Sequence, residues 1–347
     1  MEISAIEAYE VEVHEDLVYG SKTLQPSEMS RNKRLAQINC CTKGLAQHNT
    51  GWGSKKGEEV ELRGDGYIPK NDAKEGSKMP VILLIHGGGF QAGTKSAPEI
   101  VDAARYFASR GFAVLSIDYS LGPAESLVPK DWDEHGKKFF TNADGSLNEW
   151  AYKQLRPAFT GARDARLALR FLADNSEKFN LDMGRVTVLG ESAGAALATT
   201  TGLASGRDFF ECDIALSGDR KELKQKVHTV VCLWGTPLVW EVYASYKGKK
   251  EYSINKESPS ILAIHGKEDR TIPYTESKRF IAEYEKQGGK SDLWIIDQGI
   301  DQDHEAWWAV SNEGMGICDC ALNFIAKCQN LEICTTLTLI IPGTKDP

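Results

Sequence analysis

Gly-Glu-Ser-Ala-Gly at residues 190–194 is the stretch of this sequence that decides the fold. The run before it, Arg-Val-Thr-Val-Leu at residues 185–189, is short and β-branched, as is typical of a buried parallel strand. The run after it, Ala-Ala-Leu-Ala-Thr at residues 195–199, suits a packed helix. A Gly-x-Ser-x-Gly between a strand and a helix forms a sharp turn that exposes the serine hydroxyl above the sheet. We therefore predict that Ser192 is a nucleophile at such a turn.

Six short apolar runs predict strands, and amphipathic segments between them predict helices. The runs are residues 81–85, 112–118, 186–189, 230–233, 261–264 and 293–296. The clearest helical patterns are residues 99–109, 159–173 and 274–287. This alternation predicts an α/β fold, in which helices cover both faces of a mostly parallel central sheet. The 347 residues are expected to form a single domain with insertions.

Three stretches interrupt the alternation of strand and helix, and we expect them to form a lid or cap over the substrate pocket. They are residues 21–57, 122–156 and 235–259. The second and third are rich in aromatic side chains, among them Trp132, Trp150 and Trp240. Loops leave a parallel sheet at the carboxyl ends of its strands, where ligands bind. The aromatic group is therefore expected to line the pocket, and packing of the insertions is the alternative account of any single member.

The composition argues against several classes of function. A net charge of −8 and the lack of a basic run argue against nucleic acid as a partner. No apolar stretch reaches the roughly 18 residues of a membrane span, and the first residues do not resemble a signal peptide. We expect a soluble protein that is cytoplasmic, or secreted with its signal removed. The eight cysteines lack zinc-site spacing and are expected to be free thiols or, alternatively, to form one or two disulfides.

A glycine run after the first predicted strand supplies a second part of the expected site. Residues 86–89 read His-Gly-Gly-Gly, and glycines let the backbone turn its N–H groups toward a neighbouring site. In a serine hydrolase such groups form an oxyanion hole together with the N–H of the residue after the nucleophile, here Ala193. His86 itself is expected to brace this loop by hydrogen bonding rather than to act as a base.

The acid and the base are expected in loops that follow later strands. Asp269 comes after the fifth predicted strand and is the predicted acid, with Glu268 as the second choice. His304 comes after the sixth predicted strand and is the predicted base. Its main rival is His265, which also stands at the carboxyl end of a strand. Ser192, the acid and the base then follow one another in the chain order that hydrolases of this architecture use.

These side chains are sufficient for acyl transfer to water. His304 would take the proton of Ser192 as the serine oxygen attacks a carbonyl carbon, and Asp269 would hold the imidazole and stabilise its cation. Water activated by the same histidine would then hydrolyse the acyl-enzyme. This chemistry requires no metal and no organic cofactor, so we expect none.

Residues 81–326 resemble the α/β-hydrolase esterases of the hormone-sensitive-lipase-like group. The resemblance rests on residues 86–89, on Asp-Tyr-Ser-Leu-Gly-Pro at residues 118–123, on the Gly-Glu-Ser-Ala-Gly segment, and on Asp269 and His304. It implies an α/β-hydrolase fold, oxyanion-hole donors at Gly88 and Gly89, and short-acyl esters as substrates. Glu191 replaces the aspartate that this group usually has before the serine, as in the longer type-B carboxylesterases.

Two further segments indicate a narrower likeness. Val-Tyr-Gly at residues 18–20 and Asp-Gly-Tyr-Ile-Pro at residues 65–69 look like the opening of polysaccharide-associated acetyl and feruloyl esterases. The expected function is therefore a serine carboxylic ester hydrolase for short to medium esters, aromatic ones included, as small molecules or linked to carbohydrate. The alternatives are an amidase such as a formamidase, a peptidase with the same triad, and a binding protein on a degenerate hydrolase fold. The oligomeric state is left open.

Overall fold

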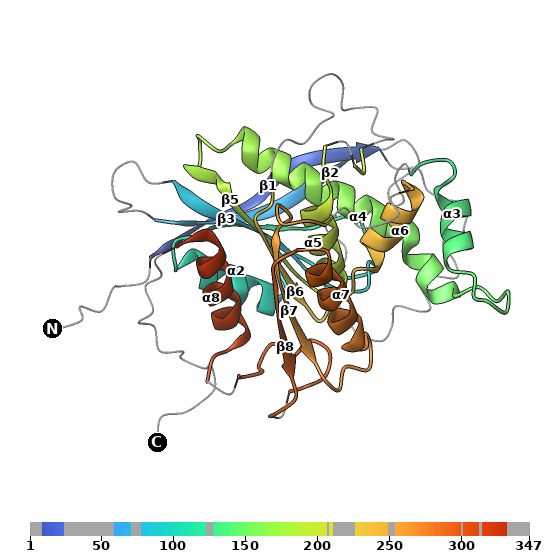
Figure 1. Ribbon diagram of the computed structural model, residues 1–347. Coiled ribbons are helices and arrows are strands. Elements are labelled where there is room, and N and C mark those ends of the chain that lie inside the picture. Colours follow the sequence, from blue (N-terminus) through green and yellow to red (C-terminus); the bar gives the residue numbers. More distant parts are fainter. Residues whose placement is uncertain are drawn as a thin grey trace.

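The computed structural model describes residues 9–23, 59–70, 78–122, 128–206, 208–210, 226–248, 254–299, 301–311 and 314–331. These residues form an eight-stranded sheet with helices on both faces (Figure 1). The strands lie in the order β1-β2-β4-β3-β5-β6-β7-β8. At one edge, β1 (Val11–Thr23) pairs antiparallel with β2 (Glu59–Pro69), which in turn pairs antiparallel with β4.

The other strands pair in parallel and correspond to the predicted apolar runs. They are β3 (Met79–Ile85), β4 (Ala113–Ile117), β5 (Leu181–Glu191), β6 (Thr229–Leu233), β7 (Ser260–Gly266) and β8 (Ser291–Ile296). Every residue of β4 and of β6 is buried, because helices cover both faces of these strands. This burial explains why the sequence shows continuous apolar runs rather than alternation. The predicted α/β fold class is confirmed.

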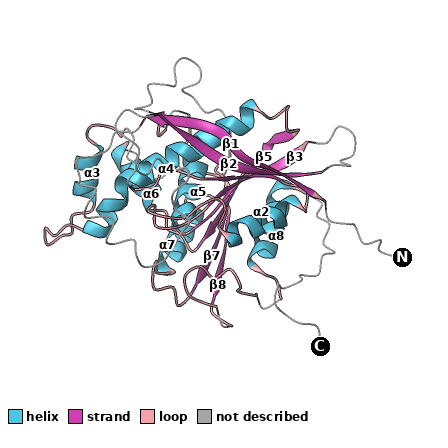
Figure 2. Cartoon of the chain, turned by 180° about the vertical axis from the view of Figure 1, so that it is seen from behind, coloured by secondary structure: helices cyan, strands magenta, loops and turns pink. Residues whose placement is uncertain are grey.

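Two apolar cores, one on each face, hold the helices against the sheet. The smaller core lies under α2 (Pro98–Ala108) and α8 (Ile317–Gln329), which Figure 2 shows together on one side of the sheet. Ile82 and Leu84 of β3 point into this core, whereas Val81 and Leu83 point into the other one. Successive side chains of a strand alternate between the two faces, so each buried strand contributes to both cores.

The larger core lies under the helices that build the site. They are α4 (Glu149–Asp174), α5 (Ala193–Leu203), α6 (Leu238–Tyr246) and α7 (Thr275–Lys286). A further helix, α3 (Trp132–Phe139), packs on α4 and α6 at the far right of Figure 1. None of the described helices is both long enough and apolar enough to cross a lipid bilayer.

The structure differs from the sequence predictions at one sheet edge and in α4. The two antiparallel strands were not predicted, and the sheet begins at Val11, before the expected insertion 21–57. Residues 24–57 of that insertion lie outside the described residues. The helix expected from residue 159 begins at Glu149, where the Asn148 side chain accepts a hydrogen bond from the Ala151 N–H at 3.1 Å. The end of the expected insertion 122–156 is therefore the first part of a long helix.

The cysteines are described only in part. Cys232, Cys318, Cys320 and Cys328 lie among the described residues, and no disulfide links any two of them. Cys40, Cys41, Cys212 and Cys334 lie outside the described residues. For these four cysteines, both the expectation of free thiols and the alternative of one or two disulfides stay predictions.

Candidate active site

Ser192 occupies the turn between β5 and α5 and has an unusual backbone conformation. Its φ of 53° and ψ of −118° place it in a region that non-glycine residues rarely adopt. The neighbouring glycines leave room for this turn, because a Cβ on Gly190 would overlap the backbone of Gly194. A Cβ on Gly194 would overlap the carbonyl oxygen of Ile85 in β3. The strand, the helix and the neighbouring strand therefore pack so closely that only glycine fits at these positions.

Ser192, His304 and Asp269 come together at the carboxyl ends of β5, β8 and β7. His304 Nε2 lies 2.8 Å from Ser192 Oγ, and His304 Nδ1 lies 2.7 Å from Asp269 Oδ2. The other carboxylate oxygen, Oδ1, accepts the backbone N–H groups of Thr271 and Ile272, both at 2.8 Å. A hydroxyl, a base and an anchored carboxylate thus form one continuous chain of hydrogen bonds, which is the arrangement of a serine hydrolase triad.

The electrostatics of the site keep the carboxylate charged and make the imidazole a stronger base. Burial by itself would raise the pKa of Asp269, but hydrogen bonds from His265 and His304 lower this pKa well below its usual range. Burial would likewise lower the pKa of His304, but the hydrogen bond to Asp269 and the charge of that carboxylate outweigh it, so this pKa is raised. Asp269 is therefore an anion whose main effect is to stabilise the cationic form of His304.

The two rival residues occupy other places. His265 is fully buried at the end of β7, and its ring nitrogens contact Asp269, Ile272 and Ser277. None of its hydrogen bonds reaches Ser192 within the described part of the chain. Glu268 is exposed to solvent, and the carboxylate that contacts the imidazole of His304 is that of Asp269.

The expected oxyanion-hole donors line the same cavity as the serine. Gly88, Gly89 and Ala193 all belong to its wall, and their N–H groups donate no hydrogen bond to any other described residue. Gly88 and Gly89 have φ values of 102° and 59°, which glycine adopts without strain. His86 donates from Nδ1 to the Gly87 carbonyl at 2.7 Å and stacks on Tyr119, so its contacts brace the loop.

Glu191 is a residue of the site to which the sequence analysis assigned no role. The Gly87 N–H donates to its Oε1, and Trp234 Nε1 donates to its Oε2 at 3.2 Å. Burial raises the pKa of this carboxyl group to about 7. The position of Glu191 in the sequence could have indicated this role. The residue before Ser192 ends a buried strand, and a carboxyl group buried there needs hydrogen-bond donors from within the protein.

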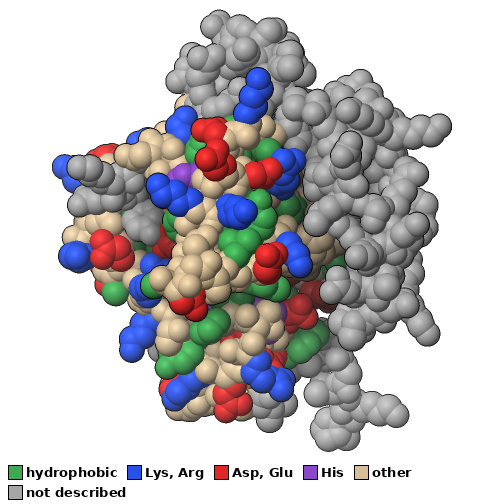
Figure 3. Space-filling view, turned by 90° about the vertical axis from the view of Figure 1, so that its right-hand side faces the viewer, with side chains coloured by type: hydrophobic (Ala, Val, Ile, Leu, Met, Phe, Trp, Pro, Cys, Tyr) green, Lys and Arg blue, Asp and Glu red, His purple; other side chains and the backbone are tan. Residues whose placement is uncertain are grey.

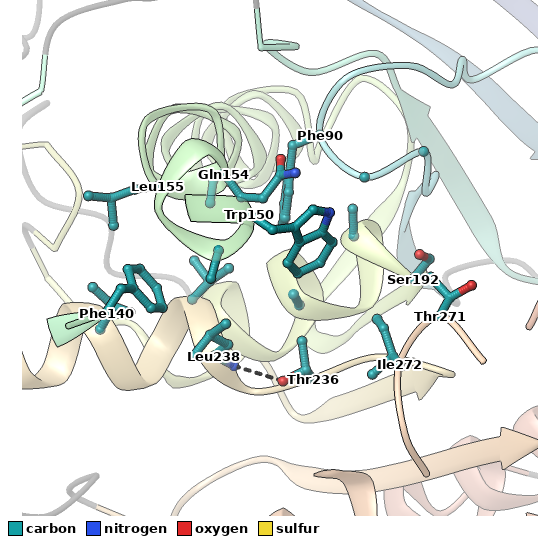
Figure 4. Close-up of a pocket in the computed structure, with 18 of the residues that line it drawn as sticks. Phe90, Phe140, Trp150, Gln154, Leu155, Ser192, Thr236, Leu238, Thr271 and Ile272 are labelled. Carbon is teal, nitrogen blue, oxygen red and sulfur yellow. Dashed lines mark hydrogen bonds between the residues drawn. The ribbon is translucent and has the colours of Figure 1, made fainter. Parts of the chain in front are cut away.

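A cavity of about 310 Å³ opens at Ser192 and runs between α4 and α6. Most of its wall is apolar or aromatic and comes from Phe90, Trp132, Phe140, Trp150, Leu155, Leu238, Val239, Val242 and Ile272. Figure 4 shows Ser192 at one end, Phe140 and Leu155 at the opposite end, and the Trp150 indole between them. Several of these side chains come from the expected insertions 122–156 and 235–259, and residues 249–253 of the latter lie outside the described residues.

Comparison with solved structures decides the fold family. A thermophilic esterase from the Planctomycetes species Thermogutta terrifontis is 18% identical, with a TM-score of 0.53 over 77% of this chain and 88% of that chain. Its butyrate-bound form gives a TM-score of 0.54 at 17% identity, over 77% and 90% of the two chains. This chain has the α/β-hydrolase fold. The BD-FAE family model matches residues 65–131 and 149–253 of this α/β-hydrolase chain.

Several curated relatives of this α/β-hydrolase chain are named as esterases. Juvenile hormone esterase of Tribolium castaneum is 29% identical over 53% of this chain and 25% of its own length. Gut esterase 1 of Caenorhabditis elegans is 31% identical over 35% of this chain and 18% of its own length. The matched region thus spans a quarter or less of these relatives. The resemblance to α/β-hydrolase esterases is confirmed, and the narrower likeness to acetyl and feruloyl esterases stays a prediction.

Proposed function

We propose that this protein is a serine esterase that hydrolyses carboxylic esters through an acyl-enzyme on Ser192. The observation that carries the proposal is the hydrogen-bonded chain from Ser192 through His304 to Asp269. Ser192 and His304 line the wall of the cavity. Gly88 and Gly89, whose N–H groups donate to no other residue in the described part of the chain, line that cavity together with the serine. The esterases among the relatives and structural neighbours support the same activity.

The reaction would proceed by acylation of Ser192 and then deacylation, and His304 would carry the proton in both steps. Neutral His304 accepts the proton of Ser192 at Nε2 as Oγ attacks the ester carbonyl, and the oxyanion faces the N–H groups lining the cavity. Collapse of the tetrahedral species breaks the ester bond, and the departing alcohol takes the proton from Nε2. Water then gives a proton to Nε2 and attacks the acyl group. The second collapse releases the acid and returns the proton to Oγ.

The cavity supports esters with a short to medium or a single aromatic group. Its volume of about 310 Å³ is at the lower end of ligand sites, and its wall is mostly apolar. Aromatic faces at Phe140 and Trp150 suit a flat ring by stacking or edge contact. We therefore propose that residues from 122–156 and 235–259 act as a cap that binds this group, while a polar or carbohydrate alcohol lies outside the cavity.

The surface charge supports a small ester rather than a polyanion as the partner. On the face shown in Figure 3, acidic and basic side chains are interspersed, with hydrophobic side chains between them. The net charge of −8 gives a nucleic acid no electrostatic attraction to the protein as a whole.

The proposal is tested with a fluorophosphonate probe and a panel of matched substrates. The probe should label the unmodified protein at Ser192, as shown by peptide mass, and should not label a Ser192→Ala variant of equal melting temperature. Turnover of p-nitrophenyl butyrate should fall at least about 10⁴-fold in the same variant. A matched p-nitroanilide, cleaved faster than the ester, would assign the protein to the amidases instead. Equal turnover by the Ser192→Ala variant would disprove the serine mechanism.

A further inference from the structure

A second histidine contacts the carboxylate of the proposed triad. His265 Nε2 lies 3.1 Å from Asp269 Oδ2, which is the oxygen that His304 Nδ1 approaches to 2.7 Å. His265 has no exposed surface, and its other ring nitrogen lies 2.7 Å from Ser277 Oγ on α7. One carboxylate oxygen therefore accepts hydrogen bonds from two imidazoles, of which only His304 reaches Ser192.

The contacts of His265 determine where its proton lies. Nε2 is also 2.9 Å from the carbonyl oxygen of Ile272, so both of its neighbours are acceptors and it must carry a hydrogen. Nδ1 faces the Ser277 hydroxyl, which also donates to the Gly235 carbonyl at 3.3 Å. Two acceptors therefore place a hydrogen on Nε2, and His265 donates it to the carboxylate of the proposed triad.

We propose that His265 is a positioning residue that holds Asp269 and limits the basicity of His304. The proposal rests on the proposed esterase function of the same site. Each hydrogen bond donated to Oδ2 stabilises the negative charge there and weakens the pull of this oxygen on the His304 cation. A base whose pKa is too high is already protonated at neutral pH and cannot accept the serine proton. His265 therefore lets His304 become neutral at a lower pH than Asp269 without this donor would allow.

Other charged groups around the triad would not change when His265 is replaced. Glu191 at the end of β5 and Glu305 in the loop of His304 both face the imidazole of His304. The Arg270 guanidinium is paired with Asp303 at the exposed edge of the site.

The residues that surround His265 on the side away from the proposed triad are either uncharged or form ion pairs with one another. Its neighbour on β8 is the apolar Ile295, and its neighbour on α7 is the neutral Ser277. Among the charged residues of α7, Arg279 forms ion pairs with Glu276 and with Glu241 of α6. Any change in the titration of His304 would therefore be due to the lost donor at Asp269.

Two substitutions distinguish the contact that Nε2 makes with Asp269 from the contact that Nδ1 makes with Ser277. The amide nitrogen of glutamine stands as many bonds from Cβ as Nε2 does, so His265→Gln keeps a donor for Asp269. The amide of asparagine replaces Nδ1 instead, so His265→Asn keeps the contact with Ser277 and loses the donor to Asp269. The ionisation of His304 is followed in each protein by nuclear magnetic resonance, with the signal assigned from a His304→Asn variant. The pH dependence of kcat/KM for p-nitrophenyl butyrate is measured in parallel.

We expect His265→Asn to raise the midpoint of the His304 titration and of the acid limb of kcat/KM by about half a unit to one unit. Below the midpoint this shift lowers kcat/KM about three- to tenfold, with a much smaller effect at pH 9. His265→Gln should keep a midpoint close to that of the unmodified protein. A purely structural role would instead lower activity equally at every pH.

The proposal is overturned if His265→Asn, folded as shown by its melting curve, has an unchanged or lower His304 midpoint. A measurement on the unmodified protein tests it even if both variants fail to fold. Long-range ¹H–¹⁵N spectra should show His265 protonated at Nε2, and protonation at Nδ1 alone would overturn the proposal. If the unmodified protein cleaves no ester, the proposed function fails, but the titration of His304 still tests the role of His265.

Discussion

The backbone N–H of Gly87 donates a hydrogen bond to the carboxylate of Glu191. This contact joins the glycine loop after β3 to the turn after β5, two segments that lie far apart in the chain. Trp234, at the end of β6, holds the other carboxylate oxygen. One buried side chain thus connects the carboxyl ends of three strands, directly behind Ser192. The relative position of the two proposed halves of the oxyanion hole therefore depends on Glu191.

Glu191 makes stability depend on pH. Burial raises the pKa of its carboxyl group in the folded protein to about 7, whereas the ordinary value is 4.5. A carboxyl whose pKa is raised on folding stabilises the fold fully below its unfolded pKa, and this contribution is lost as the pH rises through the folded value. We expect the free energy of unfolding to fall by about 2–3 kcal/mol between pH 4.5 and 8. A Glu191→Gln variant should lack most of this slope in urea titrations. Parallel slopes for the two proteins would contradict the prediction.

Activity should depend on the neutral form of His304. Its pKa is raised above 6.5 because the hydrogen bond to Asp269 and the charge of that carboxylate outweigh the effect of burial. A base must be neutral to accept a proton, so kcat/KM should fall as the pH drops through a midpoint above 6.5. Asp269→Asn should lower kcat about 10⁴-fold by favouring the wrong tautomer of the histidine. A flat profile of kcat/KM down to pH 5 would rule out His304 as the base.

Gly194, two residues after Ser192, should not tolerate replacement by a residue with a side chain. A Cβ on Gly194 would overlap the backbone oxygen of Ile85, and rigid backbone atoms cannot move aside at low cost. We expect Gly194→Ala to destabilise the protein by about 3 kcal/mol or more. The control is Gly184→Ala in the preceding strand β5, where the nearest atom is the Asp182 side chain at 3.0 Å. Urea titration compares the two variants, and similar midpoints would show that the turn can relax.

Trp150 should contribute to substrate binding without contributing much to stability. It is 62% exposed yet belongs to the wall of the cavity, so its ring is available to a bound aromatic group. We expect Trp150→Ala to lower kcat/KM for methyl cinnamate about tenfold and to leave methyl acetate hydrolysis nearly unchanged. Trp308→Ala is the matched control, because Trp308 is 68% exposed and is not part of the cavity wall. Equal losses on both esters would mean that Trp150 does not select the acyl group.

Phe140 should limit the size of the bound group. It lies at the end of the cavity opposite Ser192 (Figure 4), so Phe140→Ala would lengthen the space available to an acyl chain. We expect the preferred p-nitrophenyl ester to become longer by about two to four carbons, since each additional buried methylene contributes about 0.8 kcal/mol. Phe139→Ala is the control, because Phe139 lies next to it in the chain and is 37% exposed outside the cavity. If both variants prefer the same ester chain length, the acyl group does not bind at Phe140.

The sequence predicted best those elements whose residues interact with their immediate neighbours. The buried parallel strands appear as apolar runs, because helices cover both of their faces. The antiparallel strands β1 and β2 were missed, since they carry charged residues and glycines and pair only with distant parts of the chain. The start of α4 was missed because Pro157 lies inside the helix, a residue that usually ends one.

The sequence alone determined the fold class and predicted the type of chemistry, because the strand ends, the turn glycines and the order of Ser192, Asp269 and His304 can be read along the chain. Only the tertiary structure decided which histidine meets Ser192 and which one lies behind Asp269, since both stand at strand ends in the sequence. It also decided the roles of Glu191 and the shape of the cavity. These features depend on distances between segments that only the packing of helices on the sheet brings together.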